Sequence, residues 1–340
     1  MILWLPAAGG RVIEVELEPV SALSPATLAV VVNDADPVSL VVAGYYQERR
    51  GVPPENMVHV SFTPGQPVLG ADEFRRVKAE VDARTPERVQ AYALTWTLPY
   101  RVGCMSVTTA FAAGYDEAFC AQGCKPTKES PYFNSDARRP YAELGWRPAM
   151  MLAGRSLESV KRLIDRGVAA DGSRPPGTGY LLSTTDQARN VRAAFYPQVM
   201  ELLGPFVRLE TIEANSLRDR DDVLFYFTGL TRVADLETLG FRPGAIADHL
   251  TSAGGILVDS PQMSSVEWLE AGATGSYGTA VEPCAFPRKF PHPGIVISRY
   301  LRGETLIEAY WKSVAWPGQG VFVGEPLATP YPAYRYALPH

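Results

Sequence analysis

The sequence predicts a three-layer α/β protein, with a mainly parallel sheet and helices on both faces. From residue 27 onward, short β-branched segments alternate with amphipathic segments of helical length, which is typical of βαβ units. The apolar run Val223–Phe227 has the length of a buried central strand. Hydrophobic residues make up 46% of the 340 residues and charged residues 20%, so the chain can bury a large core.

The first half of the chain predicts four strands and three helices. Two helices have apolar faces: Val38, Val41, Val42 and Tyr45 in one, and Phe74, Val77 and Val81 in the other. Gly51 is expected to end the helix that contains Val38, and Ser156 is expected to cap the helix that begins at residue 156. The expected strands are 28–32, 57–62, 89–96 and 149–152, and the expected helices are 37–50, 72–84 and 156–168.

The second half continues the alternation. Asp186 is expected to cap a helix that runs to Leu203, and Pro243 to begin a helix that ends near Gly254. A buried strand is then expected at Ile256–Val258, followed by a helix with Trp268 and a Gly-rich strand that ends at Glu282. The remaining expected elements are strands at 179–183, 207–212 and 223–227, a helix at about 294–314 and an extended segment at 319–326.

We expect an N-terminal arm at 1–26 and a single α/β unit at 27–340, with a long irregular insertion at about 98–148. Irregular segments of this length are uncommon in compact domains and often carry function. The alternative is two α/β halves, 27–148 and 177–340.

Charge and hydropathy exclude several classes of protein. The formal net charge is −5, which argues against nucleic acid as a partner. No apolar run is long enough to cross a membrane, and no Gly-rich phosphate loop indicates a nucleotide cofactor. The start MILWLPAAGG resembles the end of a secretory signal. We therefore expect an exported protein, periplasmic or on the cell surface, with a shortened N-terminus; a cytoplasmic protein is the alternative.

The four cysteines are Cys104, Cys120, Cys124 and Cys284. Cys120 and Cys124 are close in sequence. In an oxidising compartment we expect them to form a small disulfide; the alternatives are two metal ligands and two free loop thiols.

The ends of parallel strands are where ligands bind in open α/β sheets. This rule gives a predicted ligand-binding cleft made of Asp36, Tyr100, Arg101, Thr228, Gly229, Asp259, Ser260, Gln262 and Glu282. Hard oxygen donors among the strand ends suggest a Ca²⁺ or Mg²⁺ site, with Asp34, Asp36, Asp259 and Glu282 as the candidates. Helix capping and turn formation are the alternative roles for these acidic residues.

A nucleophile needs an adjacent base, and Cys284 and His292 are the pair that the sequence offers. They are eight residues apart across a Pro-rich segment. A loop thiol and an unrelated histidine are the alternative.

Long motifs resemble a conserved, uncharacterised bacterial family found in genomes that carry the exosortase protein-sorting system. They include LAVVVNDADPVSLVVAGYYQERRGVPPENMV, GTGYLLSTTD, QMSSVEWLEAGATGSYGTAVEPC and RGETLIEAYWKSVAWPGQGVFVGEPLA. The resemblance implies an exported protein and names no activity.

The latter half is also similar to gingipain-type cysteine peptidases, which have a caspase-like fold. The matching order is VLFYFTGL, GGILVDS, WLEAGATGSYGTAVEP and a turn at Gly324-Glu325-Pro326. In those peptidases one strand ends at the catalytic histidine and the next at the catalytic cysteine. Here Leu230 follows Thr228-Gly229 at the first position, and Asp259 or Ser260 occupies the second.

Three functions follow from these observations. The first is an exported, degenerate peptidase-like domain that binds a peptide or a cell-surface polymer. The second is a peptidase-like hydrolase that uses Cys284 and His292 or an acidic metal site. The third is a structural or assembly partner of an exosortase-type sorting system.

Overall fold

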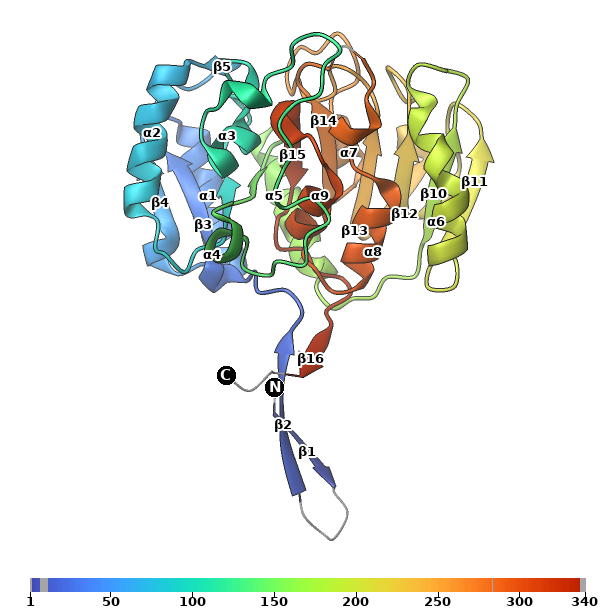
Figure 1. The fold of residues 1–340 in the computed structure, drawn as a ribbon, viewed down its shortest axis with the longest axis horizontal. Helices are drawn as coiled ribbons and strands as arrows, with labels where there is room; N and C mark the ends of the chain where they lie inside the picture. Colours follow the sequence, from blue (N-terminus) through green and yellow to red (C-terminus); the bar gives the residue numbers. More distant parts are fainter. Residues whose placement is uncertain (1, 7–11, 283, 337–340) are drawn as a thin grey trace.

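A computed structural model describes residues 2–6, 12–282 and 284–336. Within these residues ten strands form one twisted sheet, in the order β11-β10-β12-β13-β14-β15-β9-β6-β3-β4 (Figure 1). The strands are β3 (Leu28–Asn33), β4 (Met57–Val60), β6 (Ala91–Leu94), β9 (Ala149–Met151), β10 (Thr178–Ser183), β11 (Arg208–Glu213), β12 (Arg220–Thr228), β13 (Leu239–His249), β14 (Gly275–Thr279) and β15 (Gly320–Gly324).

The strand β15 joins two parallel sets. β3, β4, β6 and β9 are parallel to one another, and so are β10 to β14. β15 is antiparallel to β14, from Gly275 opposite Gly324 to Thr279 opposite Gly320, and pairs with β9 at Val323 and Met151. The fold is therefore a mainly parallel α/β sheet, as predicted.

Helices lie on both sides of the sheet (Figure 1). α1 packs beside α5, and α5 meets α7 where Arg166 donates to the Leu269 carbonyl at 3.0 Å. α6, α8 and α9 pack in series. The helices are α1 (Pro37–Arg50), α2 (Ala71–Arg84), α3 (Val107–Ala113), α4 (Pro140–Leu144), α5 (Leu157–Ala170), α6 (Tyr196–Leu203), α7 (Val266–Ala271), α8 (Pro293–Leu301) and α9 (Leu306–Ser313). None of these helices is long and apolar enough to cross a membrane.

Local signals in the sequence explain both ends of α1, the buried face of α2 and the start of α5. α1 begins after Asp36, whose side chain accepts from Val38 N at 2.9 Å, and ends at Gly51 with φ 65°. The inward face of α2 is Phe74, Val77 and Val81, as predicted. Ser156 caps α5 and accepts from Ser159 N at 3.2 Å.

The largest correction concerns residues 239–265. The segment with Pro243, predicted as a helix, is the strand β13, and the predicted strand Ile256–Val258 lies in a loop. Pro243 is compatible with a strand because the pairing of β12 with β13 shifts register between Val223 and Phe225, opposite Phe241 and Ile246. A proline at such an irregularity removes no ladder hydrogen bond.

Other predicted elements also differ from the structure. The buried face of α1 is Ser39, Val42, Ala43 and Tyr46, whereas Val38 and Val41 are exposed. The expected 294–314 helix is interrupted after Leu301 and forms α8 and α9. Asp186 accepts from Arg189 N at 3.2 Å, but α6 begins later, at Tyr196, after a 3-10 turn.

A three-stranded arm projects from the body (Figure 1). It consists of β1 (Ile2–Pro6), β2 (Val12–Pro19) and β16 (Tyr334–Tyr336). Pairing of Tyr334 with Pro19 brings the two ends of the described chain together. The expected N-terminal arm at 1–26 includes residues 1 and 7–11, which lie outside the described residues.

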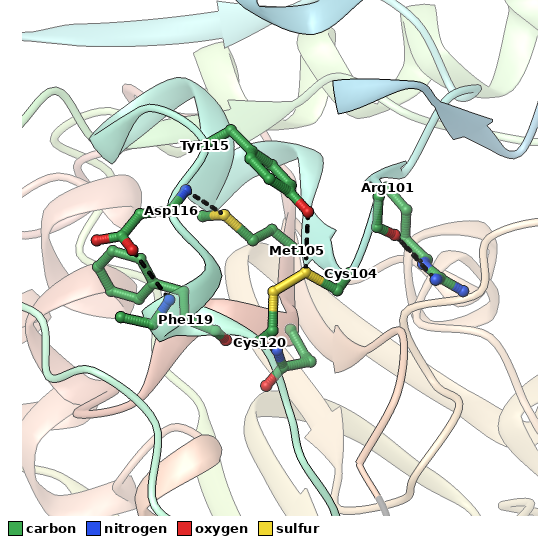
Figure 2. The surroundings of a disulfide bond; sticks show 10 residues. Arg101, Cys104, Met105, Tyr115, Asp116, Phe119 and Cys120 are labelled. Atoms are coloured by element: carbon green, nitrogen blue, oxygen red, sulfur yellow. Dashed lines mark hydrogen bonds between the residues drawn. A yellow bond between two sulfur atoms is a disulfide. The ribbon is translucent and has the colours of Figure 1, made fainter. Parts of the chain in front are cut away.

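Residues 98–148 contain α3, α4 and most of a small sheet formed by β5 (Val68–Leu69), β7 (Arg101–Val102) and β8 (Met105–Ser106). Two disulfides hold this region in place. Cys104 bonds to Cys120, with the Tyr115 hydroxyl 3.3 Å from the Cys104 sulfur (Figure 2), and Cys124 bonds to Cys284 after β14. The predicted Cys120–Cys124 bond was wrong, because each sulfur pairs with a more distant partner.

Candidate functional site

A cavity of about 770 Å³ lies where β3, β6 and β9 end. The residues after these strands form one side, and the loop after β13 forms the other. Its lining includes Asp36, Val38, Val42, Thr95, Trp96, Thr97, Leu98, Leu152, Arg155, Ser156, Leu157, Val160, Leu257, Val258, Asp259, Ser260, Gln262, Ser264 and Glu267.

Two long helices begin at this cavity. Asp36 and Val38 stand at the start of α1, and Ser156 and Leu157 at the start of α5. The positive ends of both helix dipoles therefore lie near the cavity.

The loop 250–265, which lines the cavity, is fixed by hydrogen bonds within the loop and to β14. Gln262 Oε1 accepts from Thr251 Oγ1 at 2.7 Å and from Ala253 N at 2.8 Å. Gly255 N donates to Thr279 O at 2.8 Å. This close approach requires Gly278, because a Cβ there would overlap the backbone of Gly254 and Gly255.

The charged lining is mixed in sign. Glu267 pairs with Arg155 at 3.1 Å, whereas the Asp259 carboxylate has no hydrogen bond or ion pair within the described part of the chain. Asp259 also has φ 53°, an uncommon conformation that tends to occur at functional sites. The cavity therefore offers carboxylates and one guanidinium beside apolar walls.

Four predicted cleft residues come together here: Asp36, Asp259, Ser260 and Gln262. The other five are outside the cavity lining. Tyr100 is buried and Arg101 donates to Gly103 O at 2.9 Å. Thr228 and Gly229 stand at the end of β12. Glu282 is buried, where it pairs with Lys289 at 3.2 Å and accepts from Cys284 N at 3.0 Å.

The predicted metal ligands do not form a cluster. Asp34 instead pairs with His59 at 2.6 Å, and Asp36 caps α1. Across residues 2–6, 12–282 and 284–336, no group of three or more His, Cys, Asp or Glu side chains is arranged to hold a metal ion.

β12 ends at Thr228 and β13 at His249, and these two residues pair with each other, so the residues after both strands stand at the same edge of the sheet. Leu250 to Ser252 directly follow β13, whereas Asp259 and Ser260 lie further along the chain in the loop before α7. Thr251 Oγ1 accepts from Arg189 Nε at 3.1 Å and donates to Gln262. Neither partner is a base at neutral pH.

His249 is a buried neutral residue that holds β13 to its neighbours. Its Nδ1 accepts from Trp268 Nε1 at 2.9 Å, and its Nε2 lies 3.1 Å from Met263 O. Burial lowers the pKa of His249 to about 3. Both ring nitrogens are occupied, so this histidine is not available to a nucleophile.

The predicted Cys284–His292 pair is not a thiol–imidazole pair in this structure. The Cys284 sulfur is bonded to Cys124, and a thiolate is the nucleophilic form of cysteine. His292 occupies the N-cap position of α8 without a side-chain capping hydrogen bond, and its ring centroid lies 4.4 Å from that of Phe195. Burial lowers the pKa of His292.

Several lining residues were missed from the sequence, among them Trp96, Arg155, Leu157 and Glu267. Ser156 could have been predicted as a lining residue, because it was expected to cap a helix that follows a predicted strand. Trp96 is the last residue of a predicted strand, and Leu98 follows it. The contribution of Glu267 depends on how the loop 250–265 folds, which sequence spacing does not give.

Searches of protein-family models, curated proteins and solved structures found no match to this chain.

Proposed function

We propose that the protein binds a peptide in the cavity at the ends of β3, β6 and β9, and does not cleave it. The observation that carries the proposal is the cavity. Its volume of about 770 Å³ is within the usual range for ligand sites. Apolar walls such as Trp96 and Leu257 stand beside Asp36, Asp259 and Arg155, which suits the mixed apolar and polar surface of a peptide.

The hydroxyl groups in the lining support binding without cleavage. Thr97 donates to Gly154 O at 3.1 Å, Ser260 to Ala253 O at 3.0 Å and Ser264 to Leu257 O at 3.4 Å. The protons of these three hydroxyls are therefore directed to backbone carbonyls and not to a base. The described lining includes no histidine, cysteine or lysine that would activate such a hydroxyl.

The gingipain-type resemblance fits this proposal as a fold that has lost its peptidase residues. β12, β13 and β14 are neighbours in the sheet, which is compatible with such a fold. In this proposal Leu230 stands in place of the peptidase base, and Asp259 or Ser260 in place of its nucleophile. A Cβ on Gly229 would overlap Arg189 O, so the backbone at Arg189 lies against the residue that precedes Leu230.

We also infer that the protein is exported. Its two disulfides, Cys104–Cys120 and Cys124–Cys284, are typical of oxidising compartments. An oxidising compartment outside the cytoplasm is consistent with a peptide or a peptide-containing polymer as ligand.

The test uses pools of synthetic tripeptides and pentapeptides, with the melting temperature as readout. A ligand that binds the native state raises this temperature. Val258→Trp places a large side chain in the cavity, and Val281→Trp is the matched control, because both valines are 41% exposed and only Val258 lines the cavity. We expect at least one pool to raise the melting temperature of the wild type and of Val281→Trp, but not of Val258→Trp.

Mass spectrometry of the same peptides separates binding from hydrolysis. Intact peptide after prolonged incubation is the expected result. Cleaved peptide would favour the hydrolase alternative, and a melting shift of equal size in Val258→Trp would show that the peptide binds elsewhere.

A further inference from the structure

A second hollow, of about 920 Å³, lies between α6 and α8 and is independent of the cavity described above. We call it the α6–α8 groove. Apolar side chains line it, including Val199, Leu202, Phe206, Ile295, Leu301 and Tyr331. Leu202 is 58% exposed and Phe206 is 78% exposed, so large apolar surfaces at this groove face solvent. Such exposed apolar patches often mark interaction sites.

The charge around the α6–α8 groove is positive. Three arginines line it, Arg174, Arg299 and Arg302, and none of its described lining residues is Asp or Glu. Arg299 pairs with Asp136 at 2.8 Å and Glu304 at 3.2 Å. The side chain of Arg302 is exposed and has no hydrogen bond or ion pair within the described residues. A positive rim on a protein of net charge −5 favours a partner with carboxylates.

His292 lines this groove, and one of its ring nitrogens is unpartnered among the described residues. The unpartnered atom is Nδ1, and it is buried.

We propose that the α6–α8 groove binds an amphipathic helix of a partner protein, with its apolar side chains in the groove and its carboxylates beside Arg174 and Arg302. α6 and α8 pack side by side and present a concave apolar surface, into which a third helix packs by the same ridges-into-grooves contact. The concave shape favours an inserted helix over a flat membrane surface. The proposal does not depend on peptide binding in the first cavity.

The experiment measures binding of a fluorescein-labelled 16-residue peptide by anisotropy. The peptide has Leu and Phe at helical i, i+3, i+4 and i+7 positions and Glu at most others; a second peptide has Lys in place of every Glu. We expect the Glu peptide to bind the full-length protein and the Lys peptide not to bind. Arg302→Glu and Phe206→Ser should each weaken binding by about tenfold or more.

Two control variants match these changes outside the groove. Arg139→Glu reverses another exposed arginine whose side chain has no ion pair in the described structure, and Leu40→Ser removes another exposed apolar side chain, 43% accessible on α1. We expect both to bind the Glu peptide with unchanged affinity. Equal melting temperatures of the four variants would confirm that each is folded.

Three results would overturn the proposal. One is no binding of the Glu peptide, and another is equal binding of the Glu and Lys peptides. The third is binding to phosphatidylglycerol vesicles that requires Phe206 while the Glu peptide does not bind, which would assign the groove to a membrane surface.

Discussion

Trp268 donates its indole N–H to Nδ1 of His249 across 2.9 Å, and this bond ties the end of β13 to α7. The neighbouring residue, Asp248, points to the other side of the chain, where it forms a buried ion pair with Arg192 at 2.5 Å. Two adjacent buried titratable groups therefore stand at the end of one strand, and they respond to acid in opposite directions.

The first prediction concerns Asp248→Asn and pH. The pKa of His249 is lowered by burial to about 3, so between about pH 6.5 and 3 the unfolded chain binds one more proton than the native state. Acid therefore lowers the free energy of unfolding through His249, by about 1.4 kcal/mol per pH unit. Burial raises the pKa of Asp248 to about 6 against the opposing effect of Arg192, so from about pH 6 to 4 the native state binds the extra proton.

In the wild type, the effects of His249 and Asp248 on the free energy of unfolding should cancel between pH 6 and 4. Asp248→Asn removes the effect of Asp248 and leaves that of His249. The free energy of unfolding of this variant should therefore fall relative to the wild type by about 1.4 kcal/mol for each unit by which the pH is lowered over this range. Urea denaturation at pH 7, 6, 5 and 4 measures the difference. A constant difference between the two proteins at all four pH values would contradict the opposed titrations.

The second prediction compares two glycines inside 14-residue helices. A Cβ on Gly167 in α5 would overlap the side chain of Glu325, which accepts from Tyr46 Oη at 2.7 Å and Arg50 Nε at 2.9 Å. Gly167→Ala should therefore lower the free energy of unfolding by about 1–3 kcal/mol. Gly44→Ala in α1 meets no atom within 4 Å and should raise it by up to about 1 kcal/mol. Thermal melts of both variants check the opposite signs.

The third prediction ranks the two disulfides. The Cys124–Cys284 bond closes a separation of 160 residues and the Cys104–Cys120 bond one of 16. Loop-closure entropy gives about 5 kcal/mol for the longer and about 3 kcal/mol for the shorter. Cys124→Ser/Cys284→Ser should therefore be the less stable double variant by denaturant unfolding. The reverse order would show that native contacts around Cys104 and Tyr115 outweigh the entropy of the longer loop.

The fourth prediction links β14 to the loop over the first cavity. Gly278→Ala would force the backbone at Gly254 and Gly255 to move, so amide hydrogen exchange in residues 250–265 should become faster. The Val258-dependent melting shift with peptides should also shrink. Gly70→Ala, which meets no atom within 4 Å, is the control and should change neither measurement. Unchanged exchange in Gly278→Ala would show that the loop does not need this contact.

Periodicity predicted the helices that lie on the sheet surface better than the strands near the sheet centre. α2 shows this clearly, because Phe74, Val77 and Val81 have helical spacing and are all buried. Leu239–His249 was mistaken for a helix because a short apolar segment after a proline has no unique periodicity. Pro243 is accommodated by a register shift in the pairing of β12 with β13, and such a shift depends on contacts between distant segments, which local periodicity does not report.

The candidate cavity was predictable in part, because some of its lining residues follow predicted strands. Asp36 follows a strand and was named by the strand-end rule. Asp259 was named from a strand that the structure does not contain, and it reaches the cavity through the loop that Gln262 stabilises. The cysteine pairing was not predictable, because closeness in sequence does not determine which sulfurs meet in space.

The position of β15 has a consequence for how the chain is made. Residues 320–324 are inserted between β14 and β9, so both parallel sets have an open inner edge until these residues emerge from the ribosome. Open edges of apolar strands pair readily with other chains. A nascent chain that stops before residue 320 should therefore aggregate, even though nine of the ten strands of the main sheet have by then been synthesised.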